Sequence, residues 1–546
     1  MRNHSTTDRL AARLGAVTIF GRRLADVRAE ARRRRIPSHW TNLFGIVTLA
    51  CIVVVTVTGL WLMFFYTPSS ETVTYSGGYA PLQGAEVSKA FASTMAITFD
   101  VPGGLLIRQA HHWAALLLPA AIIMQLLTTF FTGAFRRPRR GMWVLLFLVF
   151  VTALAAGWSG YALPDDLLSS TGLRITEGIA LGIPVIGTWL ATLLFGGSFP
   201  GEIIEHLYPL HVAVFPTLLL ALVVLRGLAA WRHGPPQFPG RGRTERNVVG
   251  IPLLPNAAAR AGGLFLMVTA LLLLVAATVT VSPIWLYGPA DPAAAGAGSQ
   301  PDWYTGFLDG ALRLVPPDWE FVWLGRTWTL AILVPLAVVG AYLVAVVAYP
   351  FIEEWITGDH RDHHLLDRPR NTATRTGIGV AGIVFYGVLW LAASADLITT
   401  QFSVSLETVI AALQAALVLG PIIAFSVARR ICLGLQRKDR DALLHGFETG
   451  RIVRLPGGEY VEVHQPLSES ERARITVTDA PRPAQLRPNA RGALTLADRL
   501  RVRLSRFYFA DRIEPAVPEL ESGGEPHDSD AAAALERPEA QSRGVR

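Results

Sequence analysis

Eight long apolar segments, separated by polar stretches, dominate the pattern of this 546-residue chain. They lie at about residues 42–66, 111–134, 142–163, 208–231, 261–282, 325–349, 376–397 and 406–431. Each is long enough to cross the roughly 30 Å hydrocarbon core of a bilayer as a helix. The pattern therefore predicts an all-α integral membrane protein with eight transmembrane helices.

The polar segments between the apolar ones differ in charge on alternate sides. Basic residues cluster at 136–140, 232–246 and 358–376, whereas the intervening segments are poor in Lys and Arg. Because basic loops stay in the cytoplasm, this alternation predicts that both termini lie inside the cell. We expect four parts: a basic cytoplasmic N-terminal arm (1–40), a first four-helix part (41–233), a second four-span part (234–432) and a soluble cytoplasmic tail (433–546).

Several polar segments should be folded rather than merely connecting. Residues 164–207 carry a Gly- and Pro-punctuated apolar stretch expected to lie along the outer membrane surface, and 299–315 contain a short helical pattern. In the tail, the stretch from Arg451 reads as a hairpin and 494–510 as a basic amphipathic helix, whereas the last thirty residues have a disordered composition.

Composition supports a membrane protein, since 51% of residues are hydrophobic and 17% are charged. The formal charge of +7 would fit nucleic acid, but the arginines lie beside apolar runs, which favours membrane topology and anionic lipid. The two cysteines, Cys51 and Cys432, are too few for a disulfide framework, a zinc site or an iron–sulfur site. The first thirty-five residues are arginine-rich without a central apolar core, so no cleavable signal peptide is expected.

Two histidines, His111 and His211, each open a long apolar run. Ionisable residues within membranes are functional candidates, and two imidazoles from facing helices can bind one haem iron. Interfacial histidines without a metal are the alternative. His112 should point about 100° away from His111 and serve packing or a hydrogen bond. His206 could compete with His211.

The loop histidines His363 and His364 resemble a metal pair only superficially. We expect them to lie in a solvated loop.

Longer motifs now point to a family. Arg108-Gln-Ala-His111, Gly160-Tyr161-Ala-Leu-Pro164 and Pro301-Asp302-Trp303-Tyr304, with the eight spans, resemble the cytochrome b subunit of quinol:cytochrome c oxidoreductases, closest to the actinobacterial branch. The resemblance covers about residues 36–466 and implies a haem-bearing four-helix bundle at 41–233 in a bacterial cell membrane. The second part, 234–432, would carry the quinol-site loop.

The resemblance also implies roles at the outer side. His111 and His211 would be the axial ligands of a low-potential b haem, with Arg108 as the partner of a haem propionate and Gly59 and Gly160 facing the haem. The quinol-binding motif would be Pro301, Asp302, Trp303 and Tyr304. Within it Asp302 would accept the quinol proton, with Tyr304 and Tyr161 as further catalytic residues. The alternative for this motif is a helix-capping segment only.

The resemblance implies a second, inner haem in the family, whose ligand positions differ in this sequence. Family ligands on each helix lie fourteen or fifteen residues apart, a spacing that returns to the same helix face roughly 20 Å further on. Those positions hold Gln125 and Arg226, and neither is an ordinary iron ligand. Gly45 keeps the glycine spacing on the first span, but Leu146 stands fourteen residues before Gly160. We therefore expect one haem b and an inner cavity filled by side chains.

The expected function is oxidation of quinol, by resemblance menaquinol, at the outer face. One electron would pass to a Rieske iron–sulfur protein and the other to the outer haem, in a complex with a c-type cytochrome and a possible cytochrome c oxidase supercomplex. Without the inner haem, a full Q cycle is not expected. Two alternatives stay open: a non-catalytic paralogue acting as a membrane scaffold or assembly protein, and a single-haem quinol protein that serves another partner.

Overall fold

The computed structural model describes residues 19–197, 199–291, 293–294, 300, 302–476, 483–485, 495–510 and 512–513. The start of the predicted basic arm (1–18), Pro301 of the quinol motif and residues 514–546, which include the predicted disordered end, lie outside these residues. Most of the described part of the arm forms α2 (Ile19–Arg33).

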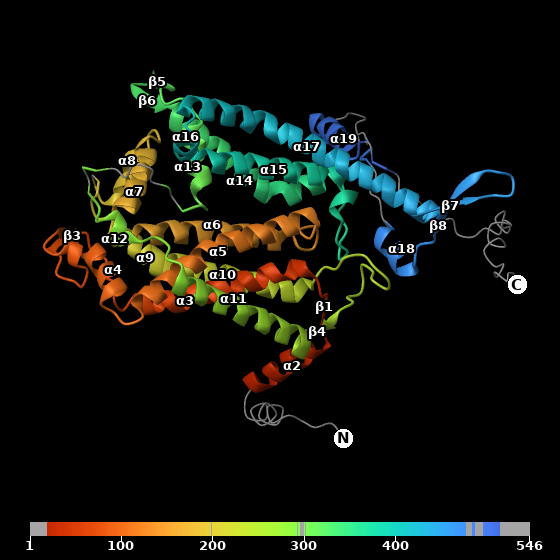
Figure 1. The fold of residues 1–546 in the computed structure, drawn as a ribbon, viewed down its shortest axis with the longest axis horizontal. Coiled ribbons are helices and arrows are strands. Elements are labelled where there is room, and N and C mark those ends of the chain that lie inside the picture. The colour runs from red at the N-terminus through yellow and green to blue at the C-terminus, as the bar shows by residue number, and fades with distance from the viewer. Residues whose placement is uncertain are drawn as a thin grey trace, which may run out of the picture.

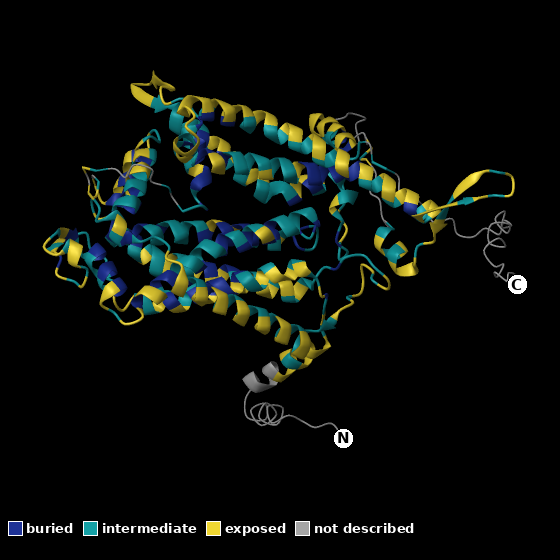
Figure 2. Ribbon diagram, in the orientation of Figure 1, coloured by how far each residue is buried: buried dark blue, intermediate teal, exposed yellow. Residues whose placement is uncertain are grey.

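Eight helices are long and apolar enough to cross a membrane within the described residues, which confirms the predicted number. They are α3 (Leu43–Leu62), α5 (Gly104–Phe131), α6 (Arg140–Ala162), the continuous run α9–η3–α10 (Ile203–Pro209, Leu210–Val214, Phe215–His233), α11 (Ala258–Thr278), α14 (Leu330–Thr357), α15 (Ala373–Ala392) and α17 (Leu406–His445). Many residues of these helices are exposed (Figure 2). They include large apolar side chains such as Leu228, Val344 and Val418. This surface suits lipid, because apolar side chains need no hydrogen bonds there and each helix pairs its own backbone N–H and C=O groups.

The helices form two groups that lie side by side (Figure 1). The first group has a core between α3, α5, α6 and α10, to which Leu272 of α11 also belongs. The second joins α14, α15 and α17 around the short helix α13 (Gly306–Arg313). Helix α11 follows the expected boundary at residue 233, yet it packs against α3 and α5 of the first group.

Short elements gather at the end of the bundle that we predict to be outside (Figure 1). They are α4 (Lys89–Phe99), α7 (Leu167–Leu181), α8 (Gly187–Phe195), α12 (Ile284–Tyr287), α13, α16 (Ala395–Phe402), η2 (Ala80–Leu82) and the hairpins β2–β3 (Thr72–Thr74, Glu86–Ser88) and β5–β6 (Glu320–Trp323, Arg326–Thr329). The segment 164–207 is thus helical, and Asp166 begins α7 by accepting hydrogen bonds from the Leu168 and Ser169 amides. The short helix expected within 299–315 is α13.

The opposite end carries the tail. Strands β1 (Arg35–Ile36) and β4 (Ile251–Pro252) pair there and contact η4 (Leu253–Ala257). The turn η1 (Trp40–Asn42) begins α3, and η5 (Pro369–Asn371) contacts α15 and α17. The predicted hairpin is present as β7 (Phe447–Arg454) and β8 (Tyr460–Gln465), followed by α18 (Glu469–Ile475). The predicted amphipathic helix is α19 (Leu496–Tyr508), which buries Val502 and contacts α14. Thr374 Oγ1 donates to the Tyr508 carbonyl oxygen at 2.7 Å, which fastens the tail to α15.

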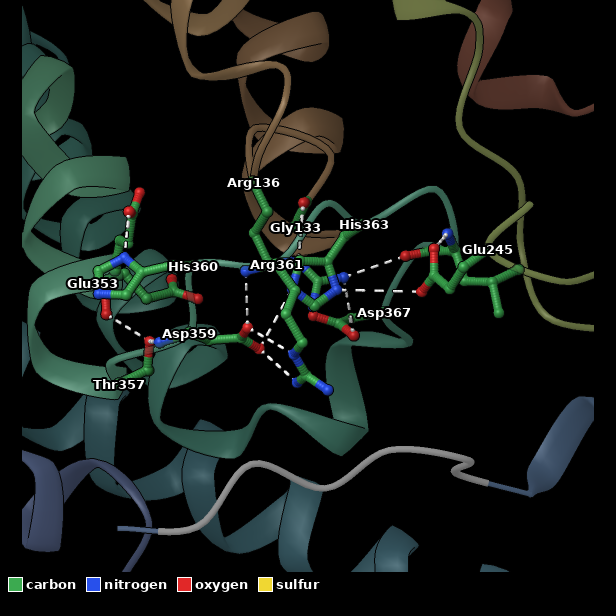
Figure 3. Close-up of polar contacts among 12 residues, drawn as sticks. Gly133, Arg136, Glu245, Glu353, Thr357, Asp359, His360, Arg361, His363 and Asp367 are labelled. Atoms are coloured by element: carbon green, nitrogen blue, oxygen red, sulfur yellow. Dashed lines mark hydrogen bonds and ion pairs between the residues drawn. The ribbon is translucent and has the colours of Figure 1, made fainter. Parts of the chain in front are cut away.

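The loop with His363 and His364 is only partly solvated, so that expectation holds in part: Asp362 is exposed, but both histidines are half-buried. The His363 side chain is 11% exposed, and its Nε2 lies 3.2 Å from Asp359 Oδ2. Its Nδ1 lies 4.0 Å from Glu245 Oε1, on the loop before α11 (Figure 3). His364 Nδ1 lies 2.9 Å from Arg139 Nη2. Asp359 lies four residues before His363 in the same loop, but Glu245 and Arg139 come from distant segments. The sequence could not reveal those two contacts, because they form only when both helix groups pack.

Asp367, four residues after His363, is held by two arginines. It accepts a hydrogen bond from Arg375 at 2.7 Å and lies 3.2 Å from Arg136, while Arg375 also pairs with buried Glu353. Burial acts to raise the pKa of the Asp367 carboxyl, but the two guanidinium groups hold it below its ordinary value. The carboxylate therefore stabilises the fold above the unfolded pKa, near about 4, and this stabilisation is lost as the pH falls through the folded pKa.

We expect Asp367→Asn to melt at a lower temperature than the wild type at pH 7. The difference should shrink as the pH falls below about 4, because the wild type then loses the same ion pairs. Thermal melting followed by circular dichroism in detergent, over a pH series, measures this. Two curves that stay parallel down to pH 3 would show that Asp367 does not cause the acid sensitivity.

Candidate functional site

The two predicted ligand histidines face each other inside the first helix group. His111 projects from α5 and His211 from the π-helical turn η3, a feature often found at functional sites. Their ring centroids are 6.1 Å apart, at an interplanar angle of 69°. Two imidazoles that bind one metal from opposite sides, each through nitrogen at about 2 Å, would place their centroids about 6 Å apart. The pair is therefore spaced as a shared iron would require.

Both histidines are oriented through Nδ1. His211 Nδ1 lies 2.9 Å from the Ala156 carbonyl oxygen, which can only accept, so Nδ1 carries the proton. His111 Nδ1 lies 3.0 Å from Thr58 Oγ1, whose own proton is directed to the Val54 carbonyl oxygen at 2.6 Å. In both rings Nε2 is then the unprotonated nitrogen, the form that binds a metal.

Glycines leave room beside both rings. A Cβ at Gly59 of α3 would lie 3.2 Å from His111 Cε1, and a Cβ at Gly160 of α6 would overlap His211 Cε1. At position 160 any larger residue would displace the ring. The predicted glycines thus lie next to the predicted ligands, at the same depth of the bundle.

A cavity of about 240 Å³, which we call the outer cavity, is lined by His111, His211, Gly59, Gly160 and Arg108. Arg108 is 8% exposed, and its Nη atoms lie 3.4 Å from the Ser282 carbonyl oxygen, a weak contact. Its Nε is buried and has no hydrogen-bond partner among the described residues. A buried guanidinium with spare donors suits an anionic group, and haem carries two carboxylates. The residues present therefore fit a haem at this end.

The predicted quinol residues open onto the same cavity. Asp302, Tyr304 and Tyr161 all line it, and the Tyr304 hydroxyl donates to Asp302 Oδ2 at 2.8 Å. Burial, together with the neighbouring Asp302 carboxylate, raises the pKa of Tyr304 well above its ordinary value, so the phenol stays protonated. Trp303 does not line the cavity: its indole nitrogen donates to the Leu116 carbonyl oxygen at 3.2 Å, which fixes the loop on α5.

His112 is a functional candidate that the sequence analysis missed. It lines the cavity, and its Nε2 lies 3.5 Å from Asp302 Oδ1. The predicted direction, about 100° from His111, was sound, but the sequence could not show that the 302–304 loop covers that face. His206 lies outside the cavity, with Nδ1 3.2 Å from the Leu194 carbonyl oxygen. It does not compete with His211 in this structure.

The positions assigned to the lost inner site also meet. Gln125, Leu146 and Arg226 line a second cavity of about 230 Å³, which we call the inner cavity. Gln125 Nε2 donates to Thr48 Oγ1 at 2.5 Å. The expectation that side chains fill this space is wrong, because Leu146 packs with Trp143 in the apolar core and both still line an open cavity.

The inner cavity does not fit a haem held by two imidazoles. His39, in the turn before α3, is the one histidine among the described residues that line it. Its Nδ1 is 3.0 Å from Thr41 Oγ1. One histidine cannot supply both axial ligands.

Comparison with known proteins agrees with this arrangement. A model of the family described as "Cytochrome b(N-terminal)/b6/petB" matches residues 116–289. The cytochrome bc1 complex cytochrome b subunit of Streptomyces coelicolor is 43% identical over 500 residues, covering 90% of this chain and 92% of that protein. The subunit of the same name from Mycobacterium tuberculosis is 46% identical over 445 residues, covering 80% of this chain and 81% of that protein.

Among solved structures, a chain of a "Hyperthermophilic respiratory Complex III" matches with a TM-score of 0.56 at 20% identity, over 75% of this chain and 98% of that one. This likeness supports the fold, and the two close relatives carry the assignment. The chain belongs to the family of cytochrome b subunits of cytochrome bc1 complexes.

Proposed function

We propose that this chain is the quinol-oxidising subunit of a bacterial quinol:cytochrome c oxidoreductase, with menaquinol as its substrate. The observation that carries the proposal is that the His111–His211 pair and the Asp302 carboxylate share one cavity. A Rieske iron–sulfur protein and a c-type cytochrome would be its partners, as its membership of the bc1 family suggests. Both termini would lie in the cytoplasm, with this cavity at the outer face.

One haem b would be held at the outer end. His111 and His211 would supply both axial nitrogens, Arg108 would pair with a propionate, and Gly59 and Gly160 would leave space for the ring. When bound, the haem supplies a one-electron acceptor beside the quinol.

The chain's own residues would handle the proton. Asp302 would accept the proton of a quinol hydroxyl, since a carboxylate within hydrogen-bond reach of the substrate can act as a general base. The Tyr304 hydroxyl holds one carboxylate oxygen at 2.8 Å and so fixes the direction of the other. That second oxygen faces His112, which would accept the proton next.

We further propose that the chain lacks the inner haem. Gln125 and Arg226 replace its ligands, and the inner cavity offers one imidazole where two are needed. The electron delivered to the outer haem would then have no second haem within this chain, so a full Q cycle is not proposed.

The same replacements favour one alternative, a non-catalytic paralogue that keeps the fold as a membrane scaffold or assembly protein. A second alternative is a single-haem protein that also oxidises quinol but passes the electrons to another acceptor. Partners that stay bound after purification separate these functions.

Purification of the tagged chain from native membranes in a mild detergent tests the proposed function. We expect a Rieske [2Fe–2S] signal by electron paramagnetic resonance and c-type haem to accompany the chain, and the complex to oxidise a menaquinol analogue. A preparation that contains b haem but neither partner would favour another electron acceptor. One that lacks haem and activity would favour the scaffold.

Gly160→Ala provides a local test of the haem site. The added methyl group would overlap His211 Cε1, so we expect a loss of about 1–3 kcal/mol in haem affinity, the usual cost of overpacking. Haem per chain, measured as the pyridine haemochrome, reports this loss. The matched control is Gly141→Ala on the same helix, where the new Cβ has no neighbour within 4 Å. Equal haem in the two variants would refute the placement of the haem beside Gly160.

A further inference from the structure

The lining of the inner cavity is basic. Three arginines, Arg139, Arg226 and Arg243, contribute to it, and no Asp or Glu lines it among the described residues. The remaining wall combines polar side chains, such as Gln125 and Asn42, with apolar ones. A cavity with several positive charges and no acid in its wall favours an anionic ligand.

Arg226 is the residue whose charge is least compensated. It lies within the span formed by α10, and its Nε is buried without a hydrogen-bond partner among the described residues. An arginine keeps its proton in proteins, and a charge at membrane depth is costly unless it is paired. Arg226 therefore needs a counter-ion that the described chain does not provide.

The other two arginines are held in place by the chain. Arg139 donates to the His363 and Gly234 carbonyl oxygens at 2.6 and 3.3 Å, and Arg243 donates to the Phe238 carbonyl oxygen at 3.0 Å. Carbonyl oxygens orient the guanidinium groups without cancelling their charge. Glu245 is the acid that most affects Arg139, but it does not line the inner cavity.

We propose that the inner cavity is an anion-binding site, in which the guanidinium of Arg226 binds a phosphate or carboxylate group. Arg243 and Arg139 add positive charge around that group, and Gln125 contributes its polar amide. The position that carries an iron ligand in the family would thus have become an anion ligand. The anion can be a free ion or the headgroup of an anionic lipid, since both offer the same oxygens. The proposal rests on the proposed absence of a haem from this cavity.

Isothermal titration of the purified complex tests the site with three probes: inorganic phosphate, dihexanoyl phosphatidylglycerol and the net-neutral dihexanoyl phosphatidylcholine. We expect at least one anionic probe to bind and the neutral probe not to. Arg226→Gln should weaken that binding by about tenfold or more, as expected for the loss of a charged hydrogen-bond donor. The matched control is Arg232→Gln, on the same helix but exposed and outside the inner cavity. It should bind like the wild type.

Arg243→Gln is the second variant, useful if Arg226→Gln fails to fold, because Arg243 lies on a loop outside the spans. It should weaken the same binding several-fold. Binding of both anionic probes would identify a free-anion site, and binding of phosphatidylglycerol alone would identify a lipid site. No binding, or binding unchanged in both cavity variants, would overturn the inference. Haem measured on the same samples separates the two proposals: two haems per chain would refute both, whereas one haem without anion binding would refute only this one.

Discussion

Replacing Asp302 with asparagine is expected to lower the rate of quinol oxidation by about 100-fold or more, the usual contribution of a general base. Asparagine keeps the size of the side chain but cannot accept the proton. The Tyr304 hydroxyl can still donate to the amide oxygen, so the loop should keep its place. The rate is measured with the purified complex as the absorbance of the quinone formed from a menaquinol analogue.

The control for this variant is Asp318→Asn, an exposed acid of the same connecting segment that does not line the outer cavity. Its rate should match the wild type. Tyr304→Phe should have a smaller effect and change the pH profile of the rate, because it alters how the carboxylate is held rather than removing it. An Asp302→Asn complex with full activity and unchanged haem would exclude Asp302 as the proton acceptor.

Restoring the inner ligands is the second large effect that we expect. The triple variant Gln125→His, Leu146→Gly and Arg226→His should raise the haem content from about one to about two per chain, since it returns both imidazoles and the glycine that leaves space for the ring. Gln125 and Arg226 already line one cavity, so the new histidines would face the same space. The pyridine haemochrome gives the number of haems, and the optical spectrum of the reduced protein should show a second b component.

The single variant Arg226→His serves as the matched control. It supplies only one of the two new imidazoles and should stay near one haem per chain. A triple variant that folds, keeps its outer haem and still binds only one would mean that the loss of the inner haem involves more than these three residues.

The fold was largely predictable because hydrophobic length determines membrane spans. The number of helices followed from apolar runs, and the depth of His111, His211 and the two outer glycines followed from helical periodicity. The number of spans and the depth of a residue can be read from the sequence of one helix at a time, and two helices with the same residue spacing place their residues at the same depths.

Contacts between distant loops could not be predicted in the same way. The approach of His112 to Asp302 depends on how the loop before α13 lies across α5. The approach of His363 to Glu245 depends on two loops that pack only in the folded protein. The open inner cavity was missed for a related reason: the Leu146 side chain packs in the apolar core and lines the cavity without filling it, which depends on how several helices pack.

We propose that this cytochrome b holds its outer haem and lacks the inner one. The most direct measurement is the number of haems b per chain by pyridine haemochrome, made on the purified protein beside His111→Ala. We expect about one haem in the wild type and none in the variant. Two haems in the wild type, or one that persists without His111, would contradict it.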